Sequence, residues 1–358
     1  MKKGLFTFIC LLAACCAFGQ NLKFTEASEL TLVGKIIETS NPYHRVDTVV
    51  YKGFTKQENI QVRCPSGLAV LFRTNSSTIS VRSEFGFEYE AVNTMPLSYR
   101  GYDLYIKKGG EWLWAGAGAL KRKHSSDNKV IVNNMDSSMK ECLLYLPLYS
   151  ELYSVKIGVD ADSVIEALDS PFRHRVGIFG SSYTQGISTS RAGMTYPAQF
   201  TRRTGIQMLS LGCSGNCKLQ PYFAEVLCDA DVDALVFDAF SNPRPELIEE
   251  RLFPFIEKIQ QSHPDIPLIF LATIYREQRN FNLKADSLEQ AKRDTSERLM
   301  KEACRKYKNV YYLDCTNATS PDHESSVDGV HPGDYGYTLW ERSIEKPLLK
   351  ILRKYGIK

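Results

Sequence analysis

The sequence has little net charge and no long apolar run outside its N-terminus. A net charge of +3 over 358 residues gives no basic stripe, so the composition does not favour a nucleic-acid partner. No later segment reaches the apolar length of a transmembrane helix, and internal repeats and low-complexity tracts are missing. With 43% hydrophobic and 24% charged residues, the chain has globular composition and room for two domains.

The cysteines do not form a metal-binding pattern. Cys213 and Cys217 are four residues apart, but no His or Cys pair with matching spacing follows them, so we expect no zinc site. Three of the ten cysteines fall in the first 19 residues. The odd number that remains leaves at least one unpaired, and we expect buried free thiols.

The first 19 residues have the organisation of a signal peptide. Two lysines precede an apolar run over residues 5–14, and residues 17–19 (AFG) have the small-x-small form of a cleavage site. We therefore expect export, to the periplasm or the medium. A second interpretation stays open, because residues 12–15 (LAAC) resemble a bacterial lipobox, which would attach a lipid to Cys15. A buried N-terminal helix is disfavoured by the flanking lysines.

Short strand-like runs fill residues 20–169. Clusters of Gly, Pro, Asn or Ser separate most of them, and no long helical period appears. This spacing predicts an all-β sandwich of the jelly-roll kind. Trp112, Trp114 and Tyr105 belong to an aromatic group that could stack on sugar rings, although core packing is the commoner reason for such a group. The expected strands cover residues 30–33, 46–51, 69–72, 78–81, 102–106, 130–132, 142–146 and 153–157.

Strand-like and helical runs alternate over residues 170–358. This alternation predicts a parallel sheet with helices on both faces, here a flavodoxin-like three-layer α/β domain with five strands. Apolar periodicity predicts helices over residues 245–261, 286–306 and 338–355. The expected strands cover residues 176–179, 208–211, 234–240, 268–273 and 310–313.

A candidate nucleophile, Ser182, follows the first of these strands. Gly180 lets the chain turn sharply without a Cβ clash, so a serine can stand at the carboxyl edge of the sheet, where open α/β sheets place their ligands. Taken alone, two serines after a glycine are most often a turn or a helix N-cap. The interpretation therefore depends on what the other strand ends supply.

Further candidate site residues follow three of the other strands. Gly215 comes after the second, Asn242 after the third, and Asp328 and His331 lie beyond the fifth. A serine hydroxyl needs a base to take its proton, and a carboxylate holds a histidine in the tautomer that can do so. The backbone N–H groups of Ser182 and Gly215 and the Asn242 amide are expected donors to an oxyanion. Each feature alone is common, but their order along the sheet favours one site.

This ordered set resembles the SGNH/GDSL hydrolase superfamily. Residues 180–182 (GSS) are similar to its first block, usually Gly-Asp-Ser, with Ser181 at the aspartate position. Gly215 matches the second-block glycine, and the last block, Asp-x-x-His, matches residues 328–331. The third block is usually Gly-x-Asn-Asp; it reads FSNP at residues 240–243, so only the asparagine carries over. A bacterial subgroup places a jelly-roll module before the hydrolase, as expected here.

The resemblance implies ester hydrolysis through an acyl-enzyme, without metal or cofactor. The triad would be Ser182, His331 and Asp328. Expected export, the aromatic-bearing β-domain and the lack of a long apolar stretch for substrate favour a small acyl group, acetyl above all, on a carbohydrate. A lipase or thioesterase of the same superfamily and a non-catalytic glycan-binding protein on this scaffold stay open as alternatives. The altered first block keeps the binding protein open, while the retained Ser, Asp and His argue against it.

Three residues beside the expected site are candidates for lining a substrate pocket. Tyr183 follows the candidate nucleophile, and Tyr275 and Arg276 follow the fourth strand. For Arg276, a solvated loop charge is an equally open interpretation.

Overall fold

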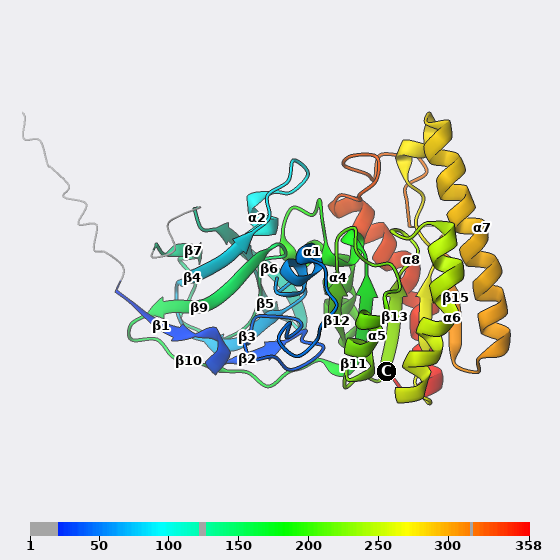
Figure 1. Cartoon of the computed structure of the whole chain (residues 1–358). Helices are drawn as coiled ribbons and strands as arrows, with labels where there is room; N and C mark the ends of the chain where they lie inside the picture. The colour runs from blue at the N-terminus through cyan, green and yellow to red at the C-terminus, as the bar shows by residue number, and fades with distance from the viewer. Residues whose placement is uncertain (1–20, 122–126, 316–317) are drawn as a thin grey trace, which may run out of the picture.

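The computed structural model describes residues 21–121, 127–315 and 318–358. It has a β-domain, from β1 to β10, and an α/β domain, from β11 to the C-terminus, which lie side by side (Figure 1). The expected signal peptide, with Cys15, falls outside these residues. Within them, no helix has both the length and the apolar character needed to cross a bilayer.

The β-domain is a sandwich of two antiparallel sheets, as the sequence predicts. One sheet holds, in order, β1 (Leu22–Glu26), β9 (Ser150–Asp160), β4 (Ile79–Glu88) and β7 (Lys129–Val132). The other holds β10 (Ile165–Ala167), β3 (Ala69–Thr74), β8 (Lys140–Tyr145), β5 (Gly101–Lys108) and β6 (Glu111–Ala119), with β2 (Thr31–Val33) paired to β3. Alternate residues point between the sheets, so that Val70 and Phe72 of β3 share a buried cluster with Val155 and Ile157 of β9.

Several segments of the β-domain differ from the sequence prediction. Residues 46–51 form turns rather than a strand, because the Asp47 side chain and carbonyl accept the backbone N–H groups of the residues that follow. Helix α1 (Lys56–Val62) was not predicted. It begins with a capping box, in which Thr55 and Glu58 satisfy each other's backbone N–H groups. Strands β1, β6 and β10 were also not predicted.

The α/β domain has five parallel strands, as predicted. Their order is β12 (Ile206–Gly212), β11 (Arg173–Gly180), β13 (Ala234–Asp238), β14 (Leu268–Leu271) and β15 (Val310–Leu313). This is the flavodoxin-like order, in which the chain reverses its direction of travel between β11 and β13 and opens a crevice at their carboxyl ends. The strands are buried on both faces, since Ile178 and Phe179 of β11 belong to different apolar clusters.

Helices cover both faces of this sheet (Figure 1). One face carries α5 (Pro221–Cys228), α6 (Pro245–Ser262) and α7 (Leu283–Lys306), and the other carries α4 (Tyr196–Thr204) and α8 (Asp334–Leu352). The short helices are α2 (Pro96–Tyr99), α3 (Ser182–Gln185), η1 (Ala27–Glu29), η2 (Ala192–Met194), η3 (Glu277–Asn280) and η4 (Arg353–Tyr355). The three predicted helices correspond to α6, α7 and α8.

The seven cysteines of the described residues are free thiols. Burial raises the pKa of the Cys64 and Cys213 thiols to about 12, so both stay protonated near neutral pH. The expectation of buried free thiols is confirmed for five of the seven, which are Cys64, Cys142, Cys213, Cys217 and Cys315.

Arg45 of the β-domain is fully buried where the two domains meet. Its Nη1 donates to the carbonyl of Gly212, at the end of β12, over 2.8 Å. Its Nε and Nη2 donate to the carbonyls of Cys64 and Gln61, each over 2.6 Å. A buried guanidinium is stable only when its N–H groups find acceptors, so this side chain fixes the end of β12 against the β-domain.

Asp103 of β5 makes a second buried contact between the domains. Its carboxylate accepts Arg191 Nη1 over 2.8 Å and the Gly193 N–H over 2.8 Å, both from the α/β domain. The Trp114 Nε1 donates to the same carboxylate over 3.0 Å. Burial raises the pKa of Asp103, and the Arg191 charge opposes that rise. Tyr105 is thus buried at this boundary, whereas Trp114 is 56% exposed although its indole N–H joins the contact. Stacking of this aromatic group on a sugar ring stays a prediction.

We expect Asp103→Ala to lower the free energy of unfolding by about 3 kcal/mol, because it leaves the Arg191 charge and the Gly193 N–H without their partner. Urea denaturation followed by circular dichroism measures this. Arg73→Ala is the matched control, since the Arg73–Glu166 ion pair is exposed and its loss should cost less than about 1 kcal/mol. Equal losses for the two variants would contradict the docking role of Asp103.

Candidate active site

The candidate nucleophile stands at a sharp turn between β11 and α3. Gly180 ends the strand, and Ser182 is the first residue of the helix. A Cβ on Gly180 would lie 1.9 Å from Thr184 Oγ1, so only glycine allows α3 to return so closely over the strand end. This close return places the Ser182 side chain, which is 6% exposed, at the carboxyl edge of the sheet.

Asp238, the last residue of β13, holds this turn from beneath. It is buried and accepts the Ser181 N–H over 3.1 Å, the Ser181 Oγ over 2.7 Å and the Thr184 Oγ1 over 3.0 Å. Burial raises the pKa of Asp238, and these donors oppose the rise by stabilising the ionised form. A second carboxylate at position 181 would face this one, which gives a physical reason for serine there. The Ser181 hydroxyl also accepts the Tyr183 N–H and so caps α3.

Ser182, His331 and Asp328 form one chain of hydrogen bonds. Ser182 Oγ lies 3.0 Å from His331 Nε2, and His331 Nδ1 lies 2.8 Å from Asp328 Oδ2. Asp328 Oδ1 accepts the backbone N–H groups of Val330, over 2.9 Å, and His331, over 2.7 Å. Gly329 makes this tight loop with φ +82°, in the left-handed region. The spacing of three residues therefore lets the carboxylate fold back onto its own histidine.

The environment of Asp328 keeps its carboxylate ionised. Partial burial acts to raise the pKa of Asp328, but the hydrogen bonds and charge of His331 outweigh it and lower the pKa to about 2. An ionised carboxylate at this position requires the proton of the neutral imidazole on Nδ1. Nε2 is then free to accept the Ser182 proton.

Tyr183 does not lie where the sequence predicts, because its side chain is fully buried beneath the site. Its ring packs edge-on against His331, with centroids 5.6 Å apart, and its hydroxyl donates to the Val330 carbonyl over 2.9 Å. Arg276 Nε donates to that hydroxyl over 2.7 Å. Tyr183 therefore supports the loop that carries His331 and has no surface to offer a substrate.

Arg276 is held by hydrogen bonds and is not the solvated loop charge that was the alternative interpretation. A contact between Arg276 and substrate stays a prediction. Its Nη1 donates to Glu289 Oε1 over 2.7 Å, and its Nη2 donates to the Ser241 carbonyl over 3.0 Å. Tyr275 is half-buried, and its hydroxyl donates to Asn280 Oδ1 over 2.8 Å. A contact between Tyr275 and substrate stays a prediction.

The side chain of Asn242 is oriented by the loop after β12. Its Oδ1 accepts the Cys217 N–H over 3.1 Å, which turns the Nδ2 donor the opposite way. In the same loop, Gly215 has φ +72° and is exposed. Both groups thus keep the donor character that an oxyanion site needs, and their convergence with the Ser182 N–H stays a prediction.

Both domains hold the loop that carries Gly215. The Ser214 N–H donates to Gln185 Oε1 of α3 over 2.9 Å. From the β-domain, Gln61 Nε2 donates to the Ser214 carbonyl over 2.9 Å, and the Tyr149 hydroxyl lies 2.7 Å from Ser214 Oγ. Reasoning from sequence missed Gln61 and Tyr149, because nothing in the spacing of residues on one domain reveals a contact with the other.

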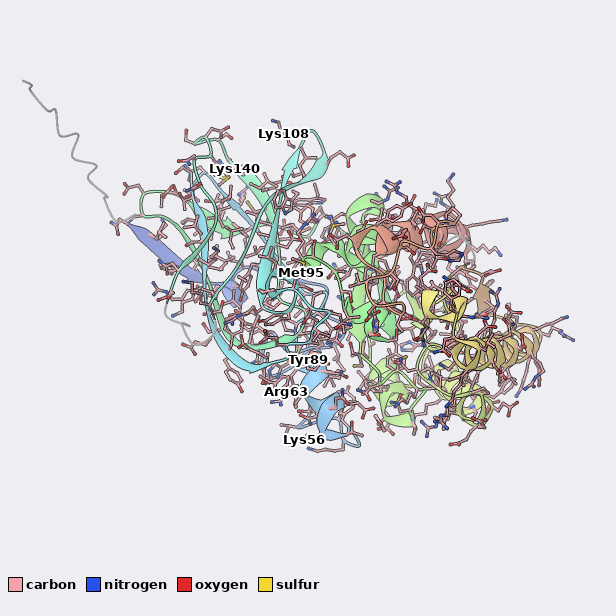
Figure 2. All side chains as sticks on the ribbon, turned by 90° about the horizontal axis from the view of Figure 1, so that it is seen from above. Lys56, Arg63, Tyr89, Met95, Lys108 and Lys140 are labelled. Carbon is pink, nitrogen blue, oxygen red and sulfur yellow. The ribbon has the colours of Figure 1, made fainter. Side chains whose placement is uncertain are left out.

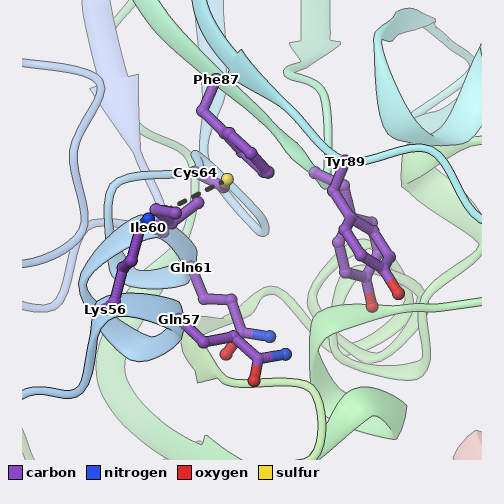
Figure 3. A pocket seen from close by; sticks show the side chains of 8 residues that line it. Lys56, Gln57, Ile60, Gln61, Cys64, Phe87 and Tyr89 are labelled. Carbon is purple, nitrogen blue, oxygen red and sulfur yellow. Dashed lines mark hydrogen bonds between the residues drawn. The ribbon is translucent and has the colours of Figure 1, made fainter.

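An apolar cavity of about 310 Å³ opens on the β-domain side of this loop. Figure 3 shows Phe87 and Tyr89 across the cavity from the side chains of α1. Gln61 and Tyr149 line it as well as holding Ser214, so the cavity and the Gly215 loop share a wall. The lining residues are Lys56, Gln57, Ile60, Gln61, Cys64, Phe87, Tyr89 and Tyr149.

Two family models cover most of the chain. The GDSL-like lipase/acylhydrolase family matches residues 173–348, and a model named GxDLY, the N-terminus of SGNH-type esterases, matches residues 22–165. The crystal structure of a protein described as a GDSL-like lipase from Bacteroides ovatus is 38% identical, with a TM-score of 0.89 over 93% of this chain and 98% of that one. The chain belongs to the GDSL-like lipase/acylhydrolase family. It is an SGNH-type hydrolase that acts on esters.

More distant structures share the fold of this SGNH hydrolase. The salicylyl-acyltransferase SsfX3 from a tetracycline biosynthetic pathway is 19% identical, with a TM-score of 0.72 over 92% of this chain and 97% of that one. A family two carbohydrate esterase from Cellvibrio japonicus is 10% identical, with a TM-score of 0.60 over 93% and 98%. A search of the curated proteins finds no match.

The GxDLY model explains a motif that the sequence analysis overlooked. Residues 101–105 of this SGNH hydrolase read GYDLY and form the first half of β5. The aspartate is Asp103, which pairs with Arg191 across the domain boundary. The motif therefore lies in the contact that docks the β-domain on the hydrolase domain.

We expect Asp328 to stabilise the SGNH hydrolase above about pH 4 and to lose this effect as the pH falls toward 2. Its pKa in the folded protein is about 2, below the ordinary value of 3.8, so folding favours the ionised form. Melting temperatures of wild type and Asp328→Asn should differ at pH 7 and converge between pH 4 and 2. Asp162→Asn, on the exposed turn after β9, is the control and should follow the wild type. A difference that stays constant down to pH 2 would contradict the assignment.

Proposed function

We propose that this protein is an exported serine esterase that removes short acyl groups, acetyl above all, from carbohydrates. The observation that carries the proposal is the continuous chain from Ser182 Oγ through His331 to Asp328, at 3.0 and 2.8 Å. It lies at the carboxyl edge of the parallel sheet, beside the crevice between β11 and β13.

In the first half of the proposed reaction, Ser182 Oγ attacks the ester carbonyl carbon while His331 Nε2 takes the hydroxyl proton. The oxygen of the tetrahedral intermediate accepts hydrogen bonds from the Ser182 and Gly215 N–H groups and from Asn242 Nδ2. His331 then gives its proton to the leaving alcohol oxygen, the C–O bond breaks, and the acyl group remains on Ser182. Asp328 stabilises the imidazolium between these two steps.

In the second half, His331 removes a proton from water, and the hydroxide attacks the acyl carbon. The bond to Ser182 Oγ breaks, Oγ recovers its proton from His331, and the carboxylic acid leaves. His331 Nε2 therefore acts in turn as base and as acid, and the proposed reaction needs no other group to carry the proton.

Two observations support a carbohydrate substrate. Family two carbohydrate esterases share the fold of the whole chain, and one of them, from Clostridium thermocellum, is known in complex with cellohexaose. The signal-peptide pattern of residues 1–19 would bring the enzyme to extracellular glycans. The apolar cavity beside the Gly215 loop favours a second candidate, an esterase or thioesterase for a bulkier acyl group.

A series of p-nitrophenyl esters from acetate to decanoate tests the reaction and the acyl preference together. We expect activity on acetate that falls with chain length and is lost in Ser182→Ala, with circular dichroism and melting temperature unchanged. Ser137→Ala, an exposed serine of the β-domain, is the matched control and should keep full activity.

Each other result of the series has its own meaning. A preference for long chains would replace the acetylesterase with the second candidate. Unchanged turnover in Ser182→Ala would contradict the assignment of the nucleophile. A wild type that neither hydrolyses any ester nor reacts with a fluorophosphonate would favour a non-catalytic glycan-binding protein.

Variants of Asn242 test the proposed oxyanion donor. Asn242→Ala removes Nδ2 and should lower kcat by roughly 100-fold to 1000-fold with little change in KM. Asn242→Asp keeps an oxygen for the Cys217 N–H but has no donor, so it should be at least as damaged as the alanine variant. If Asn242 only holds the loop, the aspartate variant should instead stay close to wild type in kcat.

A further inference from the structure

A loop of the β-domain contacts the candidate triad. Residues 89–95 connect β4 to α2, and Asn93 in this loop donates its Nδ2 to Asp328 Oδ2 over 2.8 Å. Seen from above, the labelled Tyr89 and Met95 lie where the two domains meet (Figure 2). A side chain of the β-domain thus contacts Asp328, the member of the candidate triad that is hydrogen-bonded to His331.

Contacts with Tyr149 hold the first residue of this loop, and hydrogen bonds between its own residues close a turn. The Tyr89 N–H donates to the Tyr149 carbonyl over 2.9 Å, and the two rings pack with centroids 5.8 Å apart. Thr94 Oγ1 accepts the Ala91 N–H over 2.9 Å and donates to the Ala91 carbonyl over 2.8 Å. Asn93 therefore sits in a closed turn, which lowers the entropy cost of holding its side chain on Asp328.

The carboxylate of Asp328 receives donors of two kinds. Oδ1 accepts the N–H groups of Val330 and His331, which belong to its own loop. Oδ2, the oxygen that faces the imidazole, is shared by His331 Nδ1 and Asn93 Nδ2. Hydrogen bonds to an ionised oxygen are stronger than neutral ones, so Asn93 has a direct influence on the position and charge of Oδ2.

The chemistry decides how the Asn93 amide is oriented. Its oxygen would repel the carboxylate, so the nitrogen must face Asp328. Nδ2 also lies 3.5 Å from His331 Nδ1. When Nδ1 carries its proton both nitrogens are donors, so this second contact is proximity and the hydrogen bond is the one to Asp328.

We propose that Asn93 is a positioning residue of the triad, supplied by the β-domain, so that the catalytic machinery is complete only when the two domains are docked. The proposal rests on the proposed esterase reaction. Asn93 acts through Asp328. Its Nδ2 holds Asp328 Oδ2 in line with His331 Nδ1, and its hydrogen bond competes with the imidazole for the negative charge of that oxygen.

The groups that face His331 allow this influence to be measured. Asp328 faces Nδ1, Ser182 faces Nε2, and the ring of Tyr183 packs on the imidazole with its hydroxyl held by Arg276. Asp328 is thus the charged group in direct contact with the imidazole. Without the Asn93 donor, more of its charge would stabilise the imidazolium, so the protonated base should persist to higher pH.

The test compares three variants with wild type in pH profiles of kcat/KM for p-nitrophenyl acetate. We expect Asn93→Ala to lower kcat by roughly 10-fold to 100-fold at unchanged KM and to move the acidic limb to higher pH. Asn93→Asp adds a carboxylate beside Asp328 and should move the limb further. Asn93→Gln keeps a terminal amide donor and should return the limb to its wild-type position.

Val92→Ala is the control on the same loop, because Val92 is fully exposed, and it should match the wild type. Lower rates with a lower melting temperature and no movement of the limb would mean that Asn93 only holds the loop, and would overturn the proposal. Wild-type kcat and limb in Asn93→Ala would overturn it as well.

The rate of Ser182 labelling by a fluorophosphonate separates this proposal from the proposed function. A wild type that is labelled but hydrolyses no ester means that the proposed substrate is wrong. The pH dependence of labelling in the same variants then decides the role of Asn93. A wild type that is neither labelled nor active contradicts the serine esterase, and the proposal for Asn93 falls with it.

Discussion

Arg45 lies buried between the domains, and the geometry of the site depends on how it is paired. A guanidinium removed from water must place its N–H groups on acceptors, and Arg45 places them on carbonyls of both domains, including Gly212 at the end of β12. The residues after Gly212 form the loop that carries Gly215. Because this contact is specific in direction as well as distance, it sets where the β-domain sits on the sheet edge and where that loop begins.

A second buried charge, the Asp238 carboxylate, holds the turn at the carboxyl edge of the sheet. It lies at the reversal point of the sheet and gathers donors from the turn before Ser182. A serine at position 181 suits this arrangement, since it donates to Asp238 and caps α3 with one hydroxyl. The departure of the first block from the superfamily pattern is therefore compatible with an intact turn before the candidate nucleophile.

The two domains contribute different parts of the site. The α/β domain carries the Ser182, His331 and Asp328 chain, together with Tyr183 and Arg276 beneath it. The β-domain holds the Gly215 loop, contacts Asp328 and supplies the eight residues that line the apolar cavity. The buried clusters also cross the boundary, so the β-domain is a fixed wall of the site rather than a mobile appendage.

Local rules in the sequence were enough to predict the two fold classes, the five parallel strands and the contact between Asp328 and His331, because hydrophobic period, glycine turns and loop closure act over a few residues. The same rules misassigned residues 46–51, where a side chain competes for the backbone. The tertiary structure alone decided the burial of Tyr183, the pairing of Asp103 with Arg191 and the contact of Asn93 with Asp328. These contacts join residues far apart in the chain, and their energy arises from burial and charge pairing that exist only after the domains dock.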